Sequence, residues 1–177
     1  MMNAIEETKK WLETVVIAHN ICPFAKRVFD GGGIHFATEN STDVETCLEN
    51  LLDECARLDE NDTIETTLLI YPKAFTNFDE YLDFVEIAER LLEVEDYEGI
   101  YQLASFHPNY CFEGSTDTDA ANYTNRSPYP MLHLLREESL EKALENYPNP
   151  ENIPENNIKL TRELGLQKMK ETLAACY

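Results

Sequence analysis

The chain has 177 residues and carries 34 Asp and Glu against 14 Lys and Arg, which gives a formal net charge of −20. Nucleic-acid binding depends on Lys and Arg side chains that neutralise phosphates, so this charge argues against a nucleic-acid partner. It argues equally against binding to an anionic membrane surface. The aromatic content of 10% and the repeated apolar periods indicate a folded chain rather than a disordered acidic one.

The length fits a single domain that covers residues 1–177. No stretch approaches the roughly 20 apolar residues of a membrane span, and the first residues lack the pattern of a signal peptide. We therefore expect a cytoplasmic protein whose five cysteines are reduced thiols. The sequence indicates neither a cofactor nor an oligomeric state.

Helix and strand patterns alternate along the first 106 residues. The expected elements are, in chain order, a helix over 4–19, a short helix over 24–29, a strand over 34–38, a helix over 44–58, a strand over 66–71, a helix over 78–92 and a strand over 100–106. Helices that connect successive strands in this way predict parallel strands. We therefore expect an α/β fold with a small, mainly parallel sheet of about three strands and a βαβαβ core. The alternative is an α+β ferredoxin-like fold with a fourth strand.

After residue 106 the regular alternation of helix and strand patterns ends. Residues 107–129 show no clear period, and a loop of that length in a compact domain is usually functional or contains an unrecognised element. A helix is expected over 130–146, followed by a break at 147–150. A last helix is expected from residue 154 or 157 to residue 176.

Cys22 stands directly before Pro23 and the short helix that follows. A thiol at a helix N-terminus is stabilised as the thiolate by backbone N–H groups and by the helix dipole, and Lys26 and Arg27 add positive charge. We therefore expect Cys22 to be a reactive thiol with a lowered pKa, and Arg27 to contact a substrate. The alternative is an unreactive cysteine at a helix junction, because free cysteines are commonly buried.

His107 follows the strand expected over residues 100–106, and Tyr110 lies three residues further on. Ligands of open parallel α/β sheets bind outside the carboxyl ends of the strands. His107 is therefore a candidate general base, and Tyr110 is a candidate substrate contact. The alternative is a histidine that only hydrogen-bonds a loop carbonyl.

Residues 122–137 combine hydrogen-bonding side chains with two prolines that fix the start of the expected helix. Two arginines beside a helix N-terminus are suited to holding a carboxylate or a phosphate. His133, on the same helix face as Tyr129, is a second candidate base. The structural alternative pairs the arginines with neighbouring acids. The candidate substrate contacts in this segment are Asn125, Arg126, Ser127, Tyr129 and Arg136.

Metal-binding side chains are also present at Cys22, His107, Cys111 and His133. No two of them have a recognised ligand spacing, and a zinc site needs three or four converging ligands. We therefore assign no metal ligand, and a Cys/His metal-binding protein is kept as a second alternative.

Three sequence blocks form a combined motif: CPFA at 22–25, SFHPNY at 105–110 and NRSPYPMLHLLREESL at 125–140. They resemble a bacterial family known only as a domain of unknown function, and the resemblance covers nearly the whole chain. The pattern NRSPYP-x-LH-x-LRE is specific to that family. The resemblance implies a stand-alone protein of cytoplasmic type whose activity is not established, so it assigns no catalytic residue.

These observations favour an enzyme with a pocket for a small anionic substrate. Arg126 and Arg136 would bind the anion, His107 or His133 would act as the base, and Cys22 would supply a thiol. This hypothesis requires that the five side chains converge on one pocket. The alternative is a non-catalytic module that docks a basic partner protein at the NRSPYP segment.

The net charge does not exclude a small anion. Of the 34 acidic residues 23 lie in residues 28–125, together with only three of the 14 bases. The segments that carry Cys22 and the two arginines therefore have no net charge.

Overall fold

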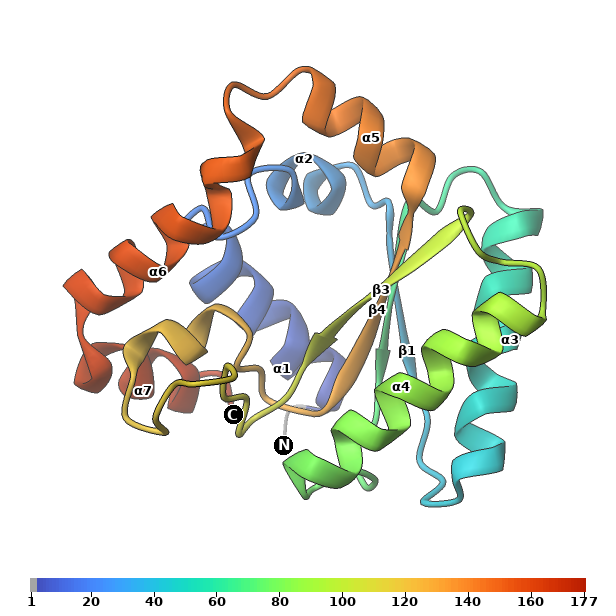
Figure 1. Ribbon diagram of the computed structural model, residues 1–177, viewed down its shortest axis with the longest axis horizontal. Helices are drawn as coiled ribbons and strands as arrows, with labels where there is room; N and C mark the ends of the chain where they lie inside the picture. The colour runs from blue at the N-terminus through green and yellow to red at the C-terminus, as the bar shows by residue number, and fades with distance from the viewer. Residues whose placement is uncertain (1–2) are drawn as a thin grey trace.

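The computed structural model describes residues 3–177 and contains one four-stranded β-sheet with helices on both faces (Figure 1). The strands are, in chain order, β1 (Ile34–Thr38), β2 (Thr66–Ile70), β3 (Tyr101–Phe106) and β4 (Met131–Arg136). Across the sheet they lie in the order β1-β2-β4-β3. The expected α/β class and the three expected strands are confirmed, and a fourth strand is added.

The sheet is mixed rather than mainly parallel. β1 and β2 are parallel neighbours, with Ile34 opposite Thr66. β4 runs antiparallel to β2 and to β3, so that His133 lies opposite Leu68 on one side and Ala104 on the other. The expected sheet of about three mainly parallel strands was wrong in that β4 is a fourth strand and lies antiparallel between β2 and β3, whereas β1, β2 and β3 run in one direction as predicted. The element order also differs from the βαββαβ order of a ferredoxin-like fold.

Seven α-helices and three shorter helical segments connect and flank the strands within residues 3–177. The α-helices are α1 (Ala4–Trp11), α2 (Ala25–Asp30), α3 (Val44–Glu60), α4 (Phe78–Val94), α5 (Glu137–Glu145), α6 (Ile153–Leu164) and α7 (Leu166–Ala174). The shorter segments are the π-helical η1 (Leu12–Ile17) and the 3-10 helices η2 (Ala120–Thr124) and η3 (Pro150–Asn152). In this part of the chain, no helix has the length and apolar character needed to cross a membrane.

The helix expected over 130–146 was wrong for its first part, because residues 131–136 form β4 and only α5 is helical. β4 is a central strand covered on both faces. Leu132 and Leu134 pack into the core beneath α3 and α4, whereas Met131 packs into the core on the other face. A strand buried on both faces has a near-continuous apolar sequence, and periodicity alone does not distinguish such a run from a buried helix.

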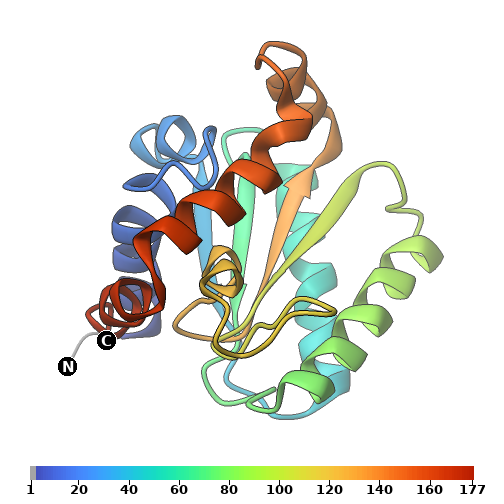
Figure 2. The same cartoon turned by 60° about the vertical axis from the view of Figure 1, so that its left-hand side comes forward.

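The single C-terminal helix expected up to residue 176 is divided into α6 and α7 at Gly165. The backbone of Gly165 has φ 84° and ψ 153°, a region that is essentially restricted to glycine. The chain therefore changes direction between two short helices, and α6 and α7 both lie on the side of the sheet occupied by α1 (Figure 2).

Two apolar cores lie on opposite faces of the sheet. One packs α3 and α4 against the sheet around Leu51, Phe84 and Leu132. The other packs α1, η1 and α7 around Trp11 and Met169. Near the second core, α2 and α5 extend over one end of the sheet (Figure 1) and leave room for a pocket.

Candidate functional site

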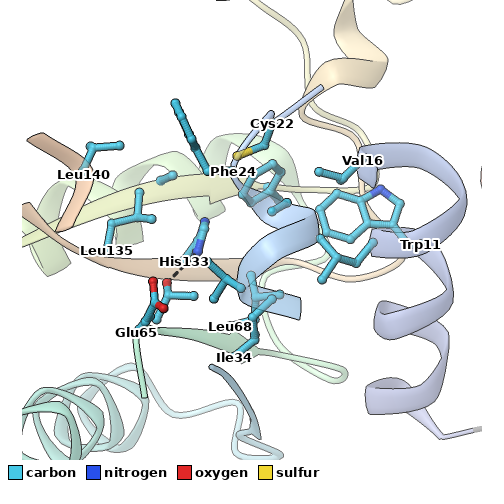
Figure 3. A pocket seen from close by; sticks show the side chains of 16 residues that line it. Trp11, Val16, Cys22, Phe24, Ile34, Glu65, Leu68, His133, Leu135 and Leu140 are labelled. Atoms are coloured by element: carbon cyan, nitrogen blue, oxygen red, sulfur yellow. Dashed lines mark hydrogen bonds between the residues drawn. The ribbon is translucent and has the colours of Figure 1, made fainter. Parts of the chain in front are cut away.

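A pocket of about 280 Å³ lies between the sheet and the helices of its second face (Figure 3). Its floor is formed by residues of all four strands, and its walls by α1, η1, α2 and α5. The lining residues are Trp11, Leu12, Val16, Cys22, Phe24, Ala25, Val28, Ile34, Glu65, Thr66, Leu68, Ala104, Phe106, His133, Leu135 and Leu140. Figure 3 shows Leu135, Leu140 and Glu65 toward one end and Trp11 toward the other.

The lining is almost entirely apolar. Polar side chains line it at Cys22, Glu65, Thr66 and His133; the indole N–H of Trp11 donates to the backbone oxygen of Arg126, and none of the lining residues is Lys or Arg. Trp11 is 1% exposed and meets Phe106 edge-on, with ring centroids 5.3 Å apart. Ligand pockets typically combine such apolar walls with a few placed polar groups. The composition therefore suits a small apolar molecule that carries one polar group.

His133 is oriented by a chain of two hydrogen bonds. Its Nε2 lies 2.7 Å from the hydroxyl oxygen of Thr66, and that hydroxyl also contacts the backbone oxygen of Leu134. A carbonyl oxygen only accepts, so the Thr66 hydroxyl must donate to Leu134. Thr66 can then only accept from His133, which requires the proton of the neutral imidazole to be on Nε2.

The other ring nitrogen of His133 is consequently an acceptor. Burial lowers the pKa of His133 to about 4, so the ring is neutral at physiological pH. No group within residues 3–177 donates a hydrogen bond to Nδ1. His133 therefore offers a lone pair to a bound molecule that has an O–H or N–H group.

Cys22 lines the same pocket from the segment between η1 and α2. Figure 3 shows its sulfur and the His133 ring on opposite walls, both directed toward the pocket. Burial raises the pKa of the Cys22 thiol, although the backbone N–H groups of Phe24 and Ala25 act in the opposite direction. The expected lowered pKa was wrong, because α2 begins only at Ala25 and desolvation outweighs its short helix terminus.

Arg27 does not line the pocket. Its Nη2 pairs with Oε2 of Glu65 at 3.1 Å, and the arginine side chain is exposed. Because Glu65 does line the pocket, this pair places a compensated charge at the rim.

His107 lies away from the pocket and is fully buried. Its Nε2 donates to the backbone oxygen of Phe75 at 2.8 Å, and its Nδ1 accepts from the backbone N–H of Asn109 at 3.0 Å. Burial also lowers its pKa, so it is a neutral ring with both nitrogens occupied. Its partners fix the loop after β2 against the loop after β3. Tyr110 belongs to the same region, with its ring 5.2 Å from that of Phe78.

The two arginines are not brought together, because they lie before and at the end of β4. Arg126 donates to the backbone oxygens of Tyr110 and Asp117, and its guanidinium stacks over the Tyr123 ring. Arg136 donates to the backbone oxygens of the last turn of α3 and of the connection that follows it. Both therefore hold backbone segments in place, and neither lines the pocket.

The remaining predicted contacts are also occupied within the fold. The side-chain amide of Asn125 donates to the backbone oxygen of Ser105, and Ser127 donates to that of Tyr129. The hydroxyl of Tyr129 donates to the carboxylate of Glu7 on α1. None of residues 125–130 is exposed, so this segment connects β3, β4 and α1 from within.

Of the five side chains required to converge, Cys22 and His133 line one pocket, whereas His107, Arg126 and Arg136 do not. Among residues 3–177, no three His, Cys, Asp or Glu side chains form a group that could hold a metal ion. The potential ligand Cys111 lies instead beside Asn122, whose amide nitrogen is 3.8 Å from its sulfur.

Sequence reasoning missed most of the lining. Thr66 carried a detectable signal, since it is a hydroxyl residue at the start of an otherwise apolar strand. Trp11, Phe106 and Leu140 carried none, because apolar residues that line a pocket have the same sequence pattern as those that fill a core.

Comparison with known proteins gives one match. A family model described as "Protein of unknown function (DUF1415)" matches residues 3–171. Neither the comparison with curated proteins nor that with solved structures gives a significant match. The match spans nearly the whole chain and confirms the resemblance to a family of unknown function. The chain belongs to the DUF1415 family.

Proposed function

We propose that the protein binds a small, neutral and largely apolar molecule in the pocket between α2, α5 and the sheet. The observation that carries this proposal is the neutral His133, held by Thr66 with its Nδ1 free, in an otherwise apolar lining. The bound molecule donates a hydrogen bond from a hydroxyl or an N–H group to Nδ1. Its apolar part lies against Trp11 and Phe106.

A neutral ligand is favoured over the anionic one expected from the sequence. An anion in an apolar site needs a cation or several donors to compensate its desolvation. Arg126 and Arg136 donate to backbone oxygens elsewhere, and Arg27 is paired with Glu65. The free nitrogen of His133 accepts hydrogen bonds and so repels a carboxylate.

A catalytic thiol at Cys22 receives less support, because burial raises the pKa of the thiol and lowers that of His133 to about 4, which leaves the imidazole a weak base for it. A docking module at the NRSPYP segment receives less support, because residues 125–130 are not exposed.

Fluorescence of the single tryptophan tests the binding proposal, because Trp11 lines the pocket. The protein is titrated at pH 7 with hexanol and, as a charged counterpart of equal chain length, with hexanoate. We expect saturable binding of hexanol and at least tenfold weaker binding of hexanoate, since an uncompensated buried charge costs several kcal/mol. Equal or tighter binding of hexanoate, or no saturable binding of hexanol, would refute the proposal.

His133→Leu provides the matched variant. It preserves the apolar wall and removes the acceptor, so we expect hexanol to bind roughly tenfold more weakly, as for one lost hydrogen bond of about 1 kcal/mol or more. His35→Leu is the control, because it makes the same change at a site on β1 that does not line the pocket. If the two variants bind hexanol equally, His133 is not the acceptor.

A further inference from the structure

A second cavity adjoins the pocket at Cys22. It measures about 320 Å³ and lies between η1, the end of β3, the loop over residues 112–125 and α6. It shares three lining residues with the first pocket, namely Val16, Cys22 and Phe106. The two cavities therefore meet at these three side chains.

We propose that the two cavities form one continuous site that binds an elongated, unbranched apolar chain ending in a neutral hydrogen-bond donor. The inference rests on the proposed function and specifies the ligand class. The donor group lies at His133, and the chain passes Val16, Cys22 and Phe106 to end beside α6.

The lining of the second cavity supports an apolar chain rather than a polar extension. No charged residue lines it, and its walls are formed mainly by Ile21, Phe112, Ile153, Pro154 and Ile158. Its polar side chains are already bonded within the protein: the amide nitrogen of Asn125 donates to Ser105, and that of Asn157 donates to Ile21 at 2.7 Å. A polar group placed there would find few free partners.

The positions of the side chains shared by the two cavities set the direction in which the apolar chain of the ligand runs. Figure 3 shows Val16 near Trp11, away from Leu140 and Leu135, while Glu65 and His133 lie toward the other end. His133 lines only the first cavity, whereas Ile153 and Ile158 line only the second, so the shared side chains lie between the polar group and α6. A compact ligand would fill only the first pocket, whereas an elongated one removes more apolar surface from water in the second.

A series of linear primary alcohols from butanol to tetradecanol tests this, with binding followed by Trp11 fluorescence. Each added CH₂ that is buried tightens binding about fourfold. We expect this increase to continue beyond the chain length that fills the first pocket. If short alcohols bind but longer ones gain nothing, the continuous site is refuted while the proposed function stands. If no alcohol binds, both fail.

Ile158→Phe fills the second cavity from α6, where Ile158 is only half-buried. We expect the variant to bind butanol like the wild type and to stop gaining affinity at a shorter chain length. Leu140→Phe is the matched control, because Leu140 lines the first pocket alone and its enlargement should weaken every alcohol in the series. An unchanged dependence on chain length in Ile158→Phe would overturn the proposal.

Photolabelling gives a readout that needs no variant. Dodecanol with a diazirine at the end remote from the hydroxyl is irradiated with the wild-type protein, and labelled peptides are identified by mass spectrometry. We expect labels on residues 153–158 of α6. Labels confined to α2 or α5 would place the chain end in the first pocket and overturn the inference.

Discussion

Arg136 offers the clearest test of whether an arginine of this chain serves the fold or an anion. Its guanidinium donates to the backbone oxygens of Leu58, Asn61 and Ile64, in the last turn of α3 and the connection to β2. A cation at this place also interacts favourably with the negative end of the helix. Replacing Arg136 by Met keeps the apolar stem and removes all of these bonds.

The expected loss of stability follows from these contacts. Hydrogen bonds to charged groups contribute about 1.5–3 kcal/mol each, and truncation leaves the carbonyl groups without that partner. Because Arg136 is half-buried and water can replace part of the interaction, we expect Arg136→Met to lower the free energy of unfolding by about 3 kcal/mol. For a chain of this size the Tm falls by about 6–12 °C. Urea unfolding followed by circular dichroism measures the change.

Arg90→Met is the control, because Arg90 makes only an exposed pair with Glu86 on α4. It should change the free energy of unfolding by less than about 0.5 kcal/mol. If Arg136→Met is as stable as Arg90→Met, the structural role of Arg136 is refuted. If phosphate raises the Tm of the wild type but not that of Arg136→Met, Arg136 binds an anion after all.

Three further predictions concern Cys22, His133 and Gly165. The raised pKa of Cys22 predicts that iodoacetamide labels this thiol more slowly at pH 7 than it labels a model thiol. Mass spectrometry measures the labelling, with Cys22→Ser as the blank. Labelling as fast as that of the model thiol would contradict the burial argument. Since the folded pKa of His133, about 4, lies below its unfolded value of about 6.5, His133 contributes stability that is complete above pH 6.5 and is lost as the pH falls toward 4. The free energy of unfolding should therefore decrease over this window less steeply in His133→Gln than in the wild type, and parallel curves would contradict it. Gly165→Ala places a side chain at φ 84° and should cost about 1–3 kcal/mol in urea unfolding, whereas Gly31→Ala, at a negative φ, should cost less.

Local patterns sufficed for most elements of the fold. The helix over 44–58 was predictable because its apolar residues repeat at helical spacing, and the strand over 66–70 because its apolar run is short and rich in β-branched residues. β4 was not predictable in this way, since Met131 and Leu132 have no strong strand preference and the run continues directly into α5. Its place between β2 and β3 is decided by pairing with residues at least 25 positions distant, which no local pattern encodes.

The candidate site likewise contains residues that the sequence predicted and residues that it assigned wrongly. Cys22 and His133 were predicted as functional residues, and the structure places both in one pocket although 110 residues separate them. The arginines were assigned to an anionic substrate because they flank the start of the helix expected over 130–146, but residues 131–136 form β4 and no helix N-terminus lies between the two arginines. In the strand, side chains alternate, and Arg136 at its end reaches the last turn of α3 instead.

The distribution of charge is an independent argument for a neutral ligand. α3 and α4 each carry six acidic residues and one arginine, and they cover the face of the sheet opposite the pocket. An anion approaching the protein meets the field of a net charge of −20 and then a lining without Lys or Arg, in which Glu65 is already paired with Arg27. A neutral molecule is indifferent to that field and gains only from the burial of its apolar surface. The preference of the pocket for hexanol over hexanoate should therefore persist at high salt, because screening removes the long-range repulsion but not the cost of burying an uncompensated carboxylate.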